Sequence, residues 1–563
     1  MTLFLGVWGG FDGRSNIVQI VSFTNSVREG RAIAEASGFA DLSVSDVLDR
    51  GVAEGPDRPL VKCARDTLSY GRTHAQARAL AAAWHNLGVG AGDRVAIDLA
   101  NGPEFVVSAL AAASLGAIVV PLNPAYSPHE LQFMLRNSEA SLVVAAEEFE
   151  ELDNLELFER MQFALPDLQY VVTVGDEDLW YDDRIFQFED LVSSGEGKRF
   201  PPPIVDSAED VYAILYTAGT TGKPKGVMLT HANLLRTSAA MAEALRLTEE
   251  DTVLITAPMF NIFGLGALMS AMTAGSAVAV MERFDPAAVS RLAEETRATV
   301  IYGAPTLFAR ELRSGSSEFD LASLRTGVIS GAPVLERVAA DIRDRLVPGI
   351  EIAYGLTETS GTVSITRGAD PPEKRKFTAG RALDGVEVRV MADDGSPLPV
   401  ESIGELAVRG FNVMKGYYRQ PDETRRSFTR DGFLRTGDLG MVDEDGYVHI
   451  VGRKQDTIVR GEYLIYPGEI EDLLRLHPAV EDVAVVGVED EVLGQRICAC
   501  IVPVEGAIVT GDEVKSFCRG QVAQYKVPDL IRFVDSFPMT GSGKIRRVEL
   551  ARMVRAEGTA RRS

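Results

Sequence analysis

The sequence predicts an α/β protein whose large N-terminal domain contains βαβ-type sheets and a β-rich subdomain, followed by a small α+β C-terminal domain. Short apolar runs alternate with helical stretches from residue 42 to about residue 380, which is typical of βαβ units with a mostly parallel sheet. Beyond that point, short strands separated by Asp-Gly turns indicate the β-rich subdomain. A compact segment of mixed helices and strands follows "GRKQD" at residues 452–456 and indicates the C-terminal domain.

The expected elements of the N-terminal domain follow in a regular order. An Ala-rich helix ends at Gly88, and it is followed by a strand, a helix and a strand over residues 93–100, 102–116 and 117–122. Ser127 has the side chain of an N-cap for the next helix, which precedes a strand at 141–146. Further short apolar runs predict strands over residues 211–217, 252–258, 276–281, 298–305 and 326–333. Ligands bind beyond the carboxyl ends of such strands.

The last third of the chain has a different pattern of expected elements, with short strands in place of alternating strands and helices. Short strands are expected within residues 385–399, 404–410 and 440–452, and a helix within 469–480. We place a domain boundary at Gln455. The expected organisation is an N-terminal tail or extension over residues 1–40, a large domain over 41–454 and a C-terminal domain over 455–563.

Composition and charge exclude several classes of protein. A chain of 563 residues is long for one hydrophobic core, and 46% hydrophobic with 25% charged residues is ordinary for a globular enzyme. A formal net charge of −24 argues against a nucleic-acid-binding face. The longest apolar run, residues 106–122, is interrupted by Ser, Gly and Pro, so we expect no membrane span. Four cysteines in a chain of this length do not form a disulfide framework, which fits a cytoplasmic location. Because successive side chains of a strand point to opposite faces, Cys498 and Cys500 are expected on the same face of one strand.

The stretch "YTAGTTGKPKG" at residues 216–226 indicates that a phosphate is held. It is not a Walker A loop, because Pro224 follows Gly222-Lys223 and Thr217 stands where the first glycine belongs. The loop could still bind a phosphate despite this mismatch with the Walker A pattern. Lys225 would add positive charge to an anion wrapped by the backbone N–H groups of Gly219, Thr220, Thr221 and Gly222.

This loop resembles the signature of the adenylate-forming superfamily, which includes acyl- and aryl-CoA ligases, luciferases and peptide-synthetase adenylation domains. The resemblance runs from about residue 42 to residue 548 and is closest to acyl-CoA synthetases and 4-coumarate-CoA-ligase-like enzymes. It implies ATP and Mg²⁺, CoA as a co-substrate, and a mobile C-terminal lid. The other family motifs appear in order as "SGAP" (330–333), "YGLTET" (354–359), "RTGDLG" (435–440), "GRKQD" (452–456) and "GSGKIRR" (541–547).

The resemblance implies a role for each matching residue. The loop from Thr217 to Lys225 would hold the β- and γ-phosphates of ATP, with Thr357 and Glu358 at the α-phosphate and Mg²⁺. Asp438 would bind the ribose hydroxyls, and Arg453 the ribose or a phosphate. The adenine site would be lined by Gly331, Ala332 and Pro333, with Tyr354 stacking on the base. Gly355 is a further residue expected to bind ATP or AMP.

The implied reaction explains these residue types. A carboxylate attacks the α-phosphate of ATP, and Lys544 with Mg²⁺ would offset the repulsion between the two anions. Pyrophosphate then departs from the loop that held it. Lys544 lies in the C-terminal domain, so it acts only if that domain closes over the larger one, and Gln455 occupies the hinge position.

Three positions depart from the family pattern. Asn261 stands where CoA ligases usually carry His, and it keeps hydrogen bonding without titrating near neutral pH. Gly461-Glu462 replaces two glycines beside the acceptor tunnel, where a Glu side chain adds bulk and negative charge. Alternatively, the alignment slips by one residue or Glu462 points to solvent. Ala353 replaces a glycine near the acyl pocket and is expected to narrow it.

The expected pocket wall is apolar and partly aromatic, and it favours a hydrophobic carboxylic acid, aromatic or medium-chain. The pocket residues are Asn261, Phe263, Ala267, Tyr302 and Ala353.

Three functions remain open from the sequence. The first is an AMP-forming ligase that transfers the acyl group from an acyl-adenylate to CoA. The second keeps the adenylation but transfers the acyl group to an amine or to a carrier-protein phosphopantetheine, as Glu462 suggests. The third is a non-catalytic acyl-nucleotide binder, which the presence of both Lys544 and Glu358 opposes.

Overall fold

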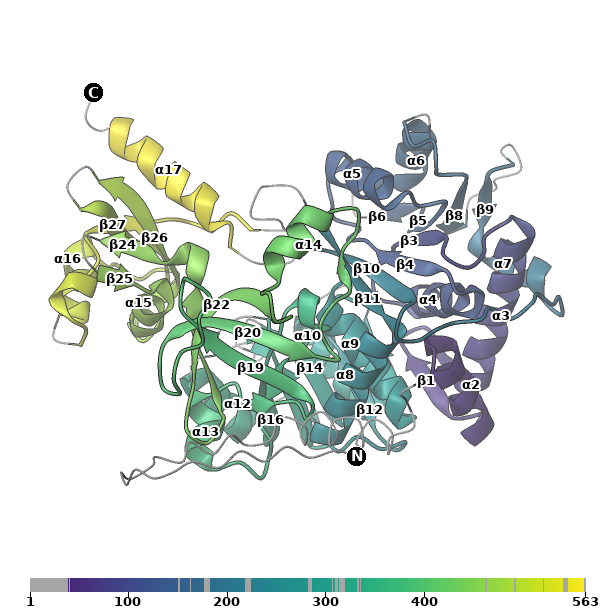
Figure 1. Ribbon diagram of the computed structural model, residues 1–563, viewed down its shortest axis with the longest axis horizontal. Coiled ribbons are helices and arrows are strands. Elements are labelled where there is room, and N and C mark those ends of the chain that lie inside the picture. Colours follow the sequence, from purple (N-terminus) through teal and green to yellow (C-terminus); the bar gives the residue numbers. More distant parts are fainter. Residues whose placement is uncertain are drawn as a thin grey trace, which may run out of the picture.

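A computed structural model describes most of the chain from Phe39 onward (Figure 1). The described residues are 39, 41–149, 152–162, 164–176, 183–217, 224–281, 286–305, 307–308, 312, 319–331, 334, 336–460, 463–490, 493–519, 521–539 and 545–560.

The first large sheet has eight strands in the order β21-β11-β10-β4-β3-β5-β8-β9. Its strands from β10 to β9 run parallel, and β11 and β21 extend it with antiparallel pairs. The strands are β3 (Arg94–Asp98), β4 (Ile118–Pro121), β5 (Leu142–Ala146), β8 (Tyr170–Val174), β9 (Ile185–Gln187), β10 (Val211–Thr217), β11 (Lys225–Thr230) and β21 (Gly416–Tyr417). The connecting helices are α3 (Tyr70–Asn86), α4 (Pro103–Leu115), α5 (Pro128–Ser138), α6 (Asn154–Gln162) and α7 (Phe188–Gly195), with β6 (Glu148–Phe149) and β7 (Leu152–Asp153) as a small hairpin.

The second large sheet has nine strands in the order β18-β17-β16-β15-β14-β12-β13-β1-β2. Its strands from β16 to β1 are parallel, and antiparallel strands stand at both edges. The strands are β1 (Pro59–Lys62), β2 (Thr67–Ser69), β12 (Thr252–Ile255), β13 (Ala277–Val280), β14 (Val300–Gly303), β15 (Thr326–Ile329), β16 (Gly349–Tyr354), β17 (Ser364–Ile365) and β18 (Arg381–Ala382). The associated helices are α2 (Val44–Glu54), α8 (His231–Ala244), α9 (Ile262–Ala274), α10 (Pro286–Thr296), α12 (Glu336–Arg345), α13 (Pro372–Phe377) and the 3₁₀ turn η2 (Thr357–Thr359).

The start of α5 shows how the sequence sets an element boundary. The Ser127 hydroxyl accepts a hydrogen bond from the Glu130 N–H at 3.4 Å, and the Glu130 carboxylate accepts one from the Ser127 N–H at 3.0 Å. This reciprocal pair is a capping box, which satisfies two N–H groups that a helix start leaves without partners. The predicted N-cap is confirmed.

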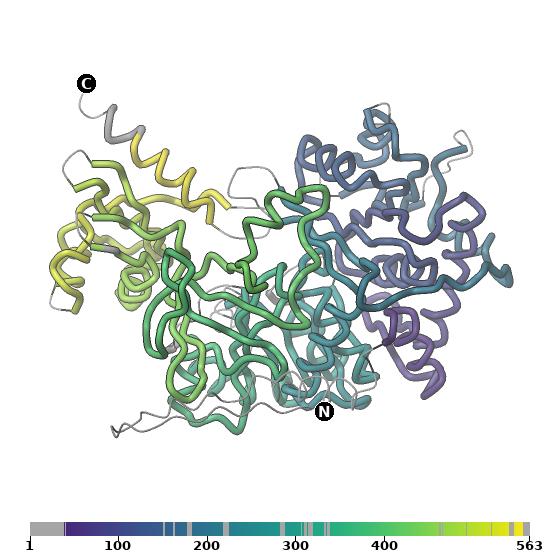
Figure 2. The backbone as a smooth tube through the Cα atoms, in the orientation of Figure 1, coloured from purple at the N-terminus to yellow at the C-terminus, as the bar shows by residue number. Residues whose placement is uncertain are grey.

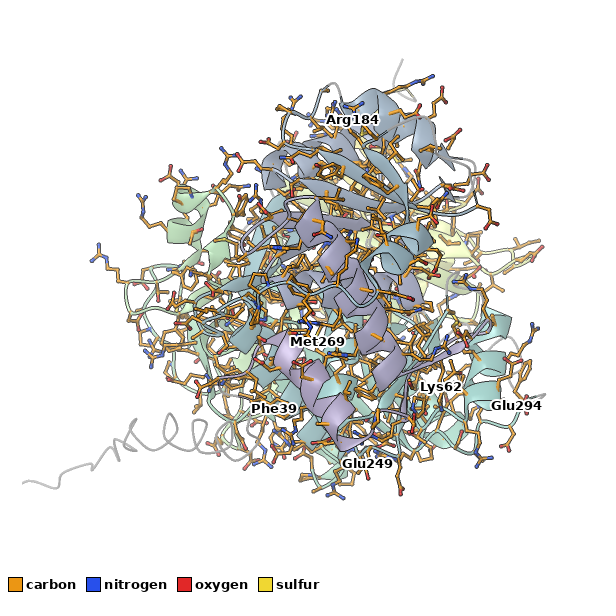
Figure 3. All side chains as sticks on the ribbon, turned by 90° about the vertical axis from the view of Figure 1, so that its right-hand side faces the viewer. Phe39, Lys62, Arg184, Glu249, Met269 and Glu294 are labelled. Carbon is orange, nitrogen blue, oxygen red and sulfur yellow. The ribbon has the colours of Figure 1, made fainter. Side chains whose placement is uncertain are left out.

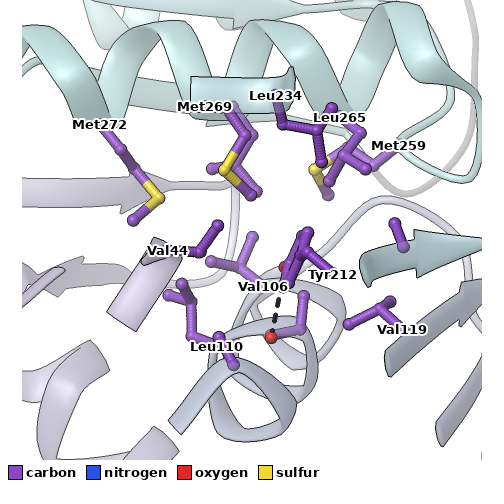
Figure 4. Close-up of a cluster of buried hydrophobic side chains, with 14 of the residues drawn as sticks. Val44, Val106, Leu110, Val119, Tyr212, Leu234, Met259, Leu265, Met269 and Met272 are labelled. Atoms are coloured by element: carbon purple, nitrogen blue, oxygen red, sulfur yellow. Dashed lines mark hydrogen bonds between the residues drawn. The ribbon is translucent and has the colours of Figure 1, made fainter. Parts of the chain in front are cut away.

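The main core lies between the two large sheets and contains side chains from both (Figure 4). Met269 and Leu265 of α9 face Val106 and Leu110 of α4 across this core, and all four are fully buried. At its margin, Phe39 is buried beneath the guanidinium of Arg50, which lies 5.1 Å from the ring centroid (Figure 3). Apolar runs that are buried on both sides therefore form the parallel strands, as expected for this class of sheet.

The β-rich subdomain is an antiparallel sheet in the order β19-β20-β22-β23. Its strands are β19 (Val386–Met391), β20 (Gly404–Gly410), β22 (Leu434–Val442) and β23 (Val448–Arg453), with α14 (Pro421–Ser427) beside β21. The β-rich subdomain predicted beyond about residue 380 thus corresponds to a separate sheet.

The C-terminal domain is a separate body at the left of Figure 1, next to the β19–β23 sheet, and Figure 2 traces it in yellow-green. Its sheet contains β24 (Ile458–Arg460), β25 (Tyr463–Ile465), β26 (Val480–Asp490), β27 (Gly494–Pro503) and β28 (Leu530–Phe533), and its helices are α15 (Pro467–Leu474), α16 (Gly511–Cys518) and α17 (Arg547–Ala560). Cys498 and Cys500 on β27 are both fully buried in one apolar cluster, so their predicted shared face is confirmed. Within the described ranges, no helix is both long and apolar enough to cross a bilayer.

Asp98 ends β3 as a buried carboxyl, 1% exposed, and its Oδ1 has no hydrogen-bond partner among the described residues. Burial raises the pKa of Asp98 to about 7. The folded chain then keeps this proton up to about that pH, whereas the unfolded chain loses it near pH 4. Asp98 therefore lowers the free energy of unfolding as pH rises from about 4 to about 7, by up to about 4 kcal/mol.

Replacing Asp98 with Asn removes this titration while keeping the shape of the side chain. We expect Asp98→Asn to raise the melting temperature at pH 8 by more than it does at pH 5, measured by thermal unfolding at both values. The exposed carboxyl Asp167 provides the control, and Asp167→Asn should change the melting temperature little at either pH. An Asp98→Asn effect of equal size at both pH values would contradict the assignment.

Candidate active site

Asp438 joins two parts of the site through its two carboxylate oxygens. Oδ2 accepts a hydrogen bond from the Tyr354 hydroxyl at 2.8 Å, and Oδ1 lies 2.7 Å from Nε of Arg453. Tyr354 ends β16 of the nine-stranded sheet, while Asp438 and Arg453 pair directly across β22 and β23. Burial, together with the Asp438 charge, holds the pKa of Tyr354 well above its usual value. The Tyr354 phenol therefore stays neutral and donates a hydrogen bond to the carboxylate.

Gly355 and η2 follow Tyr354 directly and carry the chain to Glu358. A Cβ atom on Gly355 would lie 2.2 Å from the carbonyl oxygen of Gly361, so only glycine fits there. Thr357 and Glu358 are half-buried on η2. Gly331, which follows β15, is exposed and has a φ of +90°. The structure thus places Tyr354 at the carboxyl end of β16, Glu358 shortly after it, and Gly331 just beyond the carboxyl end of the neighbouring strand β15.

A buried tyrosine hydroxyl connects Lys225 with Glu358. The Tyr417 hydroxyl donates to Glu358 Oε1 at 2.8 Å and accepts from Lys225 Nζ at 3.2 Å. The ammonium group also lies 4.2 Å from the Tyr417 ring centroid, within the range of a cation–π contact. Burial and the neighbouring Glu358 carboxylate raise the pKa of Tyr417, so its phenol keeps its proton.

The sequence did not indicate Tyr417. It lies on β21, a two-residue strand that joins the edge of the eight-stranded sheet opposite Val227. That pairing spans almost 200 positions of the chain and leaves no local pattern. The site therefore includes a residue that motif spacing alone could not find.

The predicted phosphate-binding loop, residues 217–225, connects the two strands of a hairpin, β10 and β11. Thr217 ends β10 and pairs directly with Lys225, the first residue of β11. A Walker A loop is followed by a helix, whereas a strand follows here, which agrees with the predicted mismatch. The Thr217 Oγ1 is buried without a hydrogen-bond partner among the described residues. Gly219, Thr220, Thr221 and Gly222 lie outside the described residues.

An apolar pocket of about 250 Å³ lies between α8, α9 and the segment that follows η2. Phe263 and Tyr302 line it as predicted, and their ring centroids are 5.5 Å apart. The other lining residues are Thr237, Ser238 and Met241 of α8, Ile262, Gly266 and Ser270 of α9, and Ser360, Gly361 and Thr362.

The remaining predicted pocket residues lie elsewhere. Ala267 is fully buried in the main core and is not among the lining residues, because α9 is covered on both sides. Ala353 is buried on β16 opposite Ile365 and is also outside the lining, so its methyl group does not narrow this pocket. Asn261 is half-buried at the N-cap of α9, next to the lining residue Ile262.

Gln455 is exposed in the 3₁₀ turn η3 (Lys454–Asp456), between the four-stranded and the C-terminal sheets. Its two neighbours form ion pairs with different bodies. Lys454 Nζ lies 3.1 Å from Glu405 of β20, and Asp456 lies 3.4 Å from Arg547 of α17. Gln455 thus lies between two ion-paired residues, one bound to the four-stranded sheet and the other to the C-terminal domain. Four other predicted residues, Ala332, Pro333, Gly461 and Glu462, lie outside the described residues, as does Lys544.

Comparison with known proteins decides the family. Residues 48–418 match the family model described as "AMP-binding enzyme", and residues 469–544 match "AMP-binding enzyme C-terminal domain". The chain belongs to the AMP-binding enzyme family. It is 30% identical over 542 residues to the medium-chain acyl-CoA ligase ACSF2, mitochondrial, of Bos taurus, covering 91% of this chain and 87% of that protein.

Two solved structures are similar over most of this AMP-binding enzyme. The anthranilate CoA ligase AuaEII in complex with anthranoyl-AMP superposes with a TM-score of 0.84 at 26% identity, covering 91% of this chain and 97% of that chain. The amide bond synthetase McbA from Marinactinospora thermotolerans gives 0.80 at 26% identity, covering 91% and 99%. The fold and family predictions are confirmed, and the enzyme is AMP-forming and acyl-CoA-ligase-like.

Tyr417 provides a test of the Lys225–Glu358 connection in this AMP-binding enzyme. We expect Tyr417→Phe to slow pyrophosphate release from ATP roughly 10- to 100-fold, because both charged groups lose the hydrogen bond that fixes them. The adjacent Tyr418, whose hydroxyl lies 3.5 Å from Glu139, supplies the matched control Tyr418→Phe. Wild-type pyrophosphate release in Tyr417→Phe would show that the bridge has no role in catalysis.

Proposed function

We propose that this enzyme activates a hydrophobic carboxylic acid, aromatic or medium-chain, as an acyl-adenylate and then transfers the acyl group to CoA. One observation carries the proposal. The pocket wall at residues 360–362 directly follows η2, which bears Glu358 and its connection through Tyr417 to Lys225. An acid held in the pocket would therefore have its carboxyl group beside the charged groups that bind phosphate.

In the proposed reaction, the chain's residues position two anions for attack. Thr217 and Lys225 would hold the phosphates that leave, and the unpartnered Thr217 hydroxyl is suited to a phosphate oxygen. Asp438 would accept hydrogen bonds from the ribose hydroxyls while Arg453 keeps it oriented. Lys544 would add the charge that stabilises the pentavalent α-phosphate. The adenine would lie among Gly331, Ala332, Pro333, Tyr354 and Gly355.

Glu358 is suited to hold Mg²⁺ together with ATP. Its carboxylate offers hard oxygen ligands, and the Tyr417 hydrogen bond fixes one of these oxygens. Mg²⁺ is usually bound by one or two carboxylates and the substrate phosphates, so a single carboxylate at this place is enough for the proposed role. When bound, Mg²⁺ supplies charge neutralisation at the phosphates.

The choice of acid rests on the pocket and on the relatives. Met241, Ile262 and Phe263 give the pocket an apolar wall, which suits the hydrophobic part of an acid. ACSF2 is named for medium-chain acids and AuaEII for anthranilate. Both classes of acid therefore belong in the substrate screen.

The acceptor has a second candidate. Glu462 replaces a glycine beside the expected thiol tunnel, and the amide bond synthetase McbA has the same fold. An amine needs no tunnel for pantetheine, so transfer to an amine gives an amide without the obstruction. CoA remains the simpler proposal because ACSF2 and AuaEII are both CoA ligases by name.

Mass spectrometry of the products decides between these acceptors. A reaction with ATP, Mg²⁺, CoA and a pool of aryl and C4–C12 acids is expected to give acyl-CoA products. Acyl-adenylates that accumulate without thioester would reject CoA as the acceptor. A second reaction supplied with amines would then yield amides if the runner-up is correct.

Lys544→Ala tests the adenylation role of the C-terminal domain. We expect pyrophosphate release to fall by roughly 100-fold or more, because the charge on the α-phosphate loses its partner. The melting temperature should stay the same. Lys515, whose Nζ donates to the Asp529 carbonyl at 2.7 Å in the same domain, gives the control Lys515→Ala. Unchanged pyrophosphate release in Lys544→Ala would refute the assignment.

A further inference from the structure

Gly266 of α9 is a glycine that neither the backbone conformation nor the packing requires. It lies inside the helix, and its φ is outside the left-handed region that favours glycine. Beyond the neighbouring backbone of its own helix, a Cβ atom at this position would meet no atom of the described residues within 4 Å. Gly264 is the opposite case, because a Cβ there would lie 2.3 Å from the Pro258 carbonyl oxygen. A glycine inside a helix is less favourable than alanine, so Gly266 lowers stability without a gain in packing.

The space beside Gly266 is the apolar pocket. Gly266 lines this pocket together with Ile262, Phe263 and Ser270, which lie on the same face of α9 at helical spacing. Met241 lines it from the neighbouring helix α8. The pocket therefore continues along α9 on both sides of Gly266, and the absence of a side chain at this position keeps its middle open.

The position of Gly361 shows which end of the pocket lies near the charged groups. A Cβ atom on Gly361 would lie 3.2 Å from Cγ1 of Ile262, so the wall segment 360–362 contacts the first turn of α9. This segment directly follows η2, which bears Glu358. At a rise of about 1.5 Å per residue, Gly266 lies about 6 Å and Ser270 about 12 Å along the helix from Ile262. Under the proposed function, the carboxyl group of the acid therefore lies at the Ile262 end, and its apolar part extends toward Ser270.

We propose that Gly266 determines the length of the acid that this enzyme uses, and that the acid is elongated, with an apolar part that passes Gly266 toward Ser270. This inference rests on the proposed function and narrows its substrate class. A compact acid such as butanoic or benzoic acid leaves the far half of the pocket unfilled. Octanoic or cinnamic acid reaches beyond Gly266 and buries more apolar surface there.

The test compares a long and a short acid of the same kind, octanoic with butanoic acid and cinnamic with benzoic acid. In at least one pair, the wild type should show a kcat/KM for pyrophosphate release that is roughly 10- to 100-fold higher with the long acid. Gly266→Leu places a side chain in the middle of the pocket and should lower this ratio of long to short acid by roughly 10- to 100-fold. Gly266→Ala should lower the ratio by a smaller factor, and it decides the test if Gly266→Leu does not fold.

The melting temperature separates this role from a general loss of structure. Gly266→Ala should raise the melting temperature, because alanine is the better helix former and its methyl group meets no described neighbour. A lower melting temperature would contradict the open space beside Gly266. Gly90, in the turn before β3, supplies the matched control, because a Cβ there also meets no described atom within 4 Å and Gly90 does not line the pocket. Gly90→Leu should keep the ratio of long to short acid.

Equilibrium binding of the four acids, measured by calorimetry without ATP, separates this inference from the proposed function. A binding preference for the long acid that is lost in Gly266→Leu, with no pyrophosphate release even by the wild type, would reject the proposed function and support the role of Gly266. Pyrophosphate release without preference for the long acid in either pair, or a preference that survives in Gly266→Leu, would overturn the role of Gly266. Failure of both binding and release with all four acids would reject both.

Discussion

The carboxylate of Asp438 is the contact on which the arrangement of the site depends. It is buried, and it is held on one side by the Tyr354 hydroxyl and on the other by the Arg453 guanidinium. A buried charge is tolerated only with such partners, so losing either one would leave the negative charge of Asp438 less well compensated. Because Tyr354 ends β16 while Arg453 ends β23 next to η3, this one carboxylate connects the nine-stranded sheet to the β-rich subdomain, close to the position predicted for the hinge.

A similar arrangement occurs where we propose that the phosphates of ATP bind. There a tyrosine hydroxyl again donates to a carboxylate, from Tyr417 to Glu358, and a cation, Lys225, completes the group. The two clusters draw on different sheets, and the short segment from Tyr354 to Glu358, which includes η2, connects them. Ligand sites beyond the carboxyl ends of strands are common in α/β proteins because loops from several strands converge there.

Much of the fold could be predicted because its local signals are strong. Central parallel strands such as β5, β12 and β14 are buried apolar runs, and Ser127 caps α5 with Glu130 as a capping box requires. The site was predictable only where residues lie inside contiguous motifs, such as Tyr354 with Glu358. Tyr417 was missed because its position depends on a sheet edge formed by residues distant in sequence. Whether Ala267 faces the pocket or the core could not be read from the sequence, because α9 is apolar all round and periodicity does not distinguish its faces. In the structure, Ala267 is fully buried in the main core.

Acid-dependent exchange of labelled pyrophosphate into ATP by the wild-type enzyme tests the central claim most directly. The exchange requires reversible formation of an acyl-adenylate and is independent of the final acceptor. We predict that exchange is absent without an acid and appears with at least one apolar carboxylic acid in the pool. ATP binding without exchange for any acid would contradict the account and would leave a nucleotide-binding protein without adenylating activity.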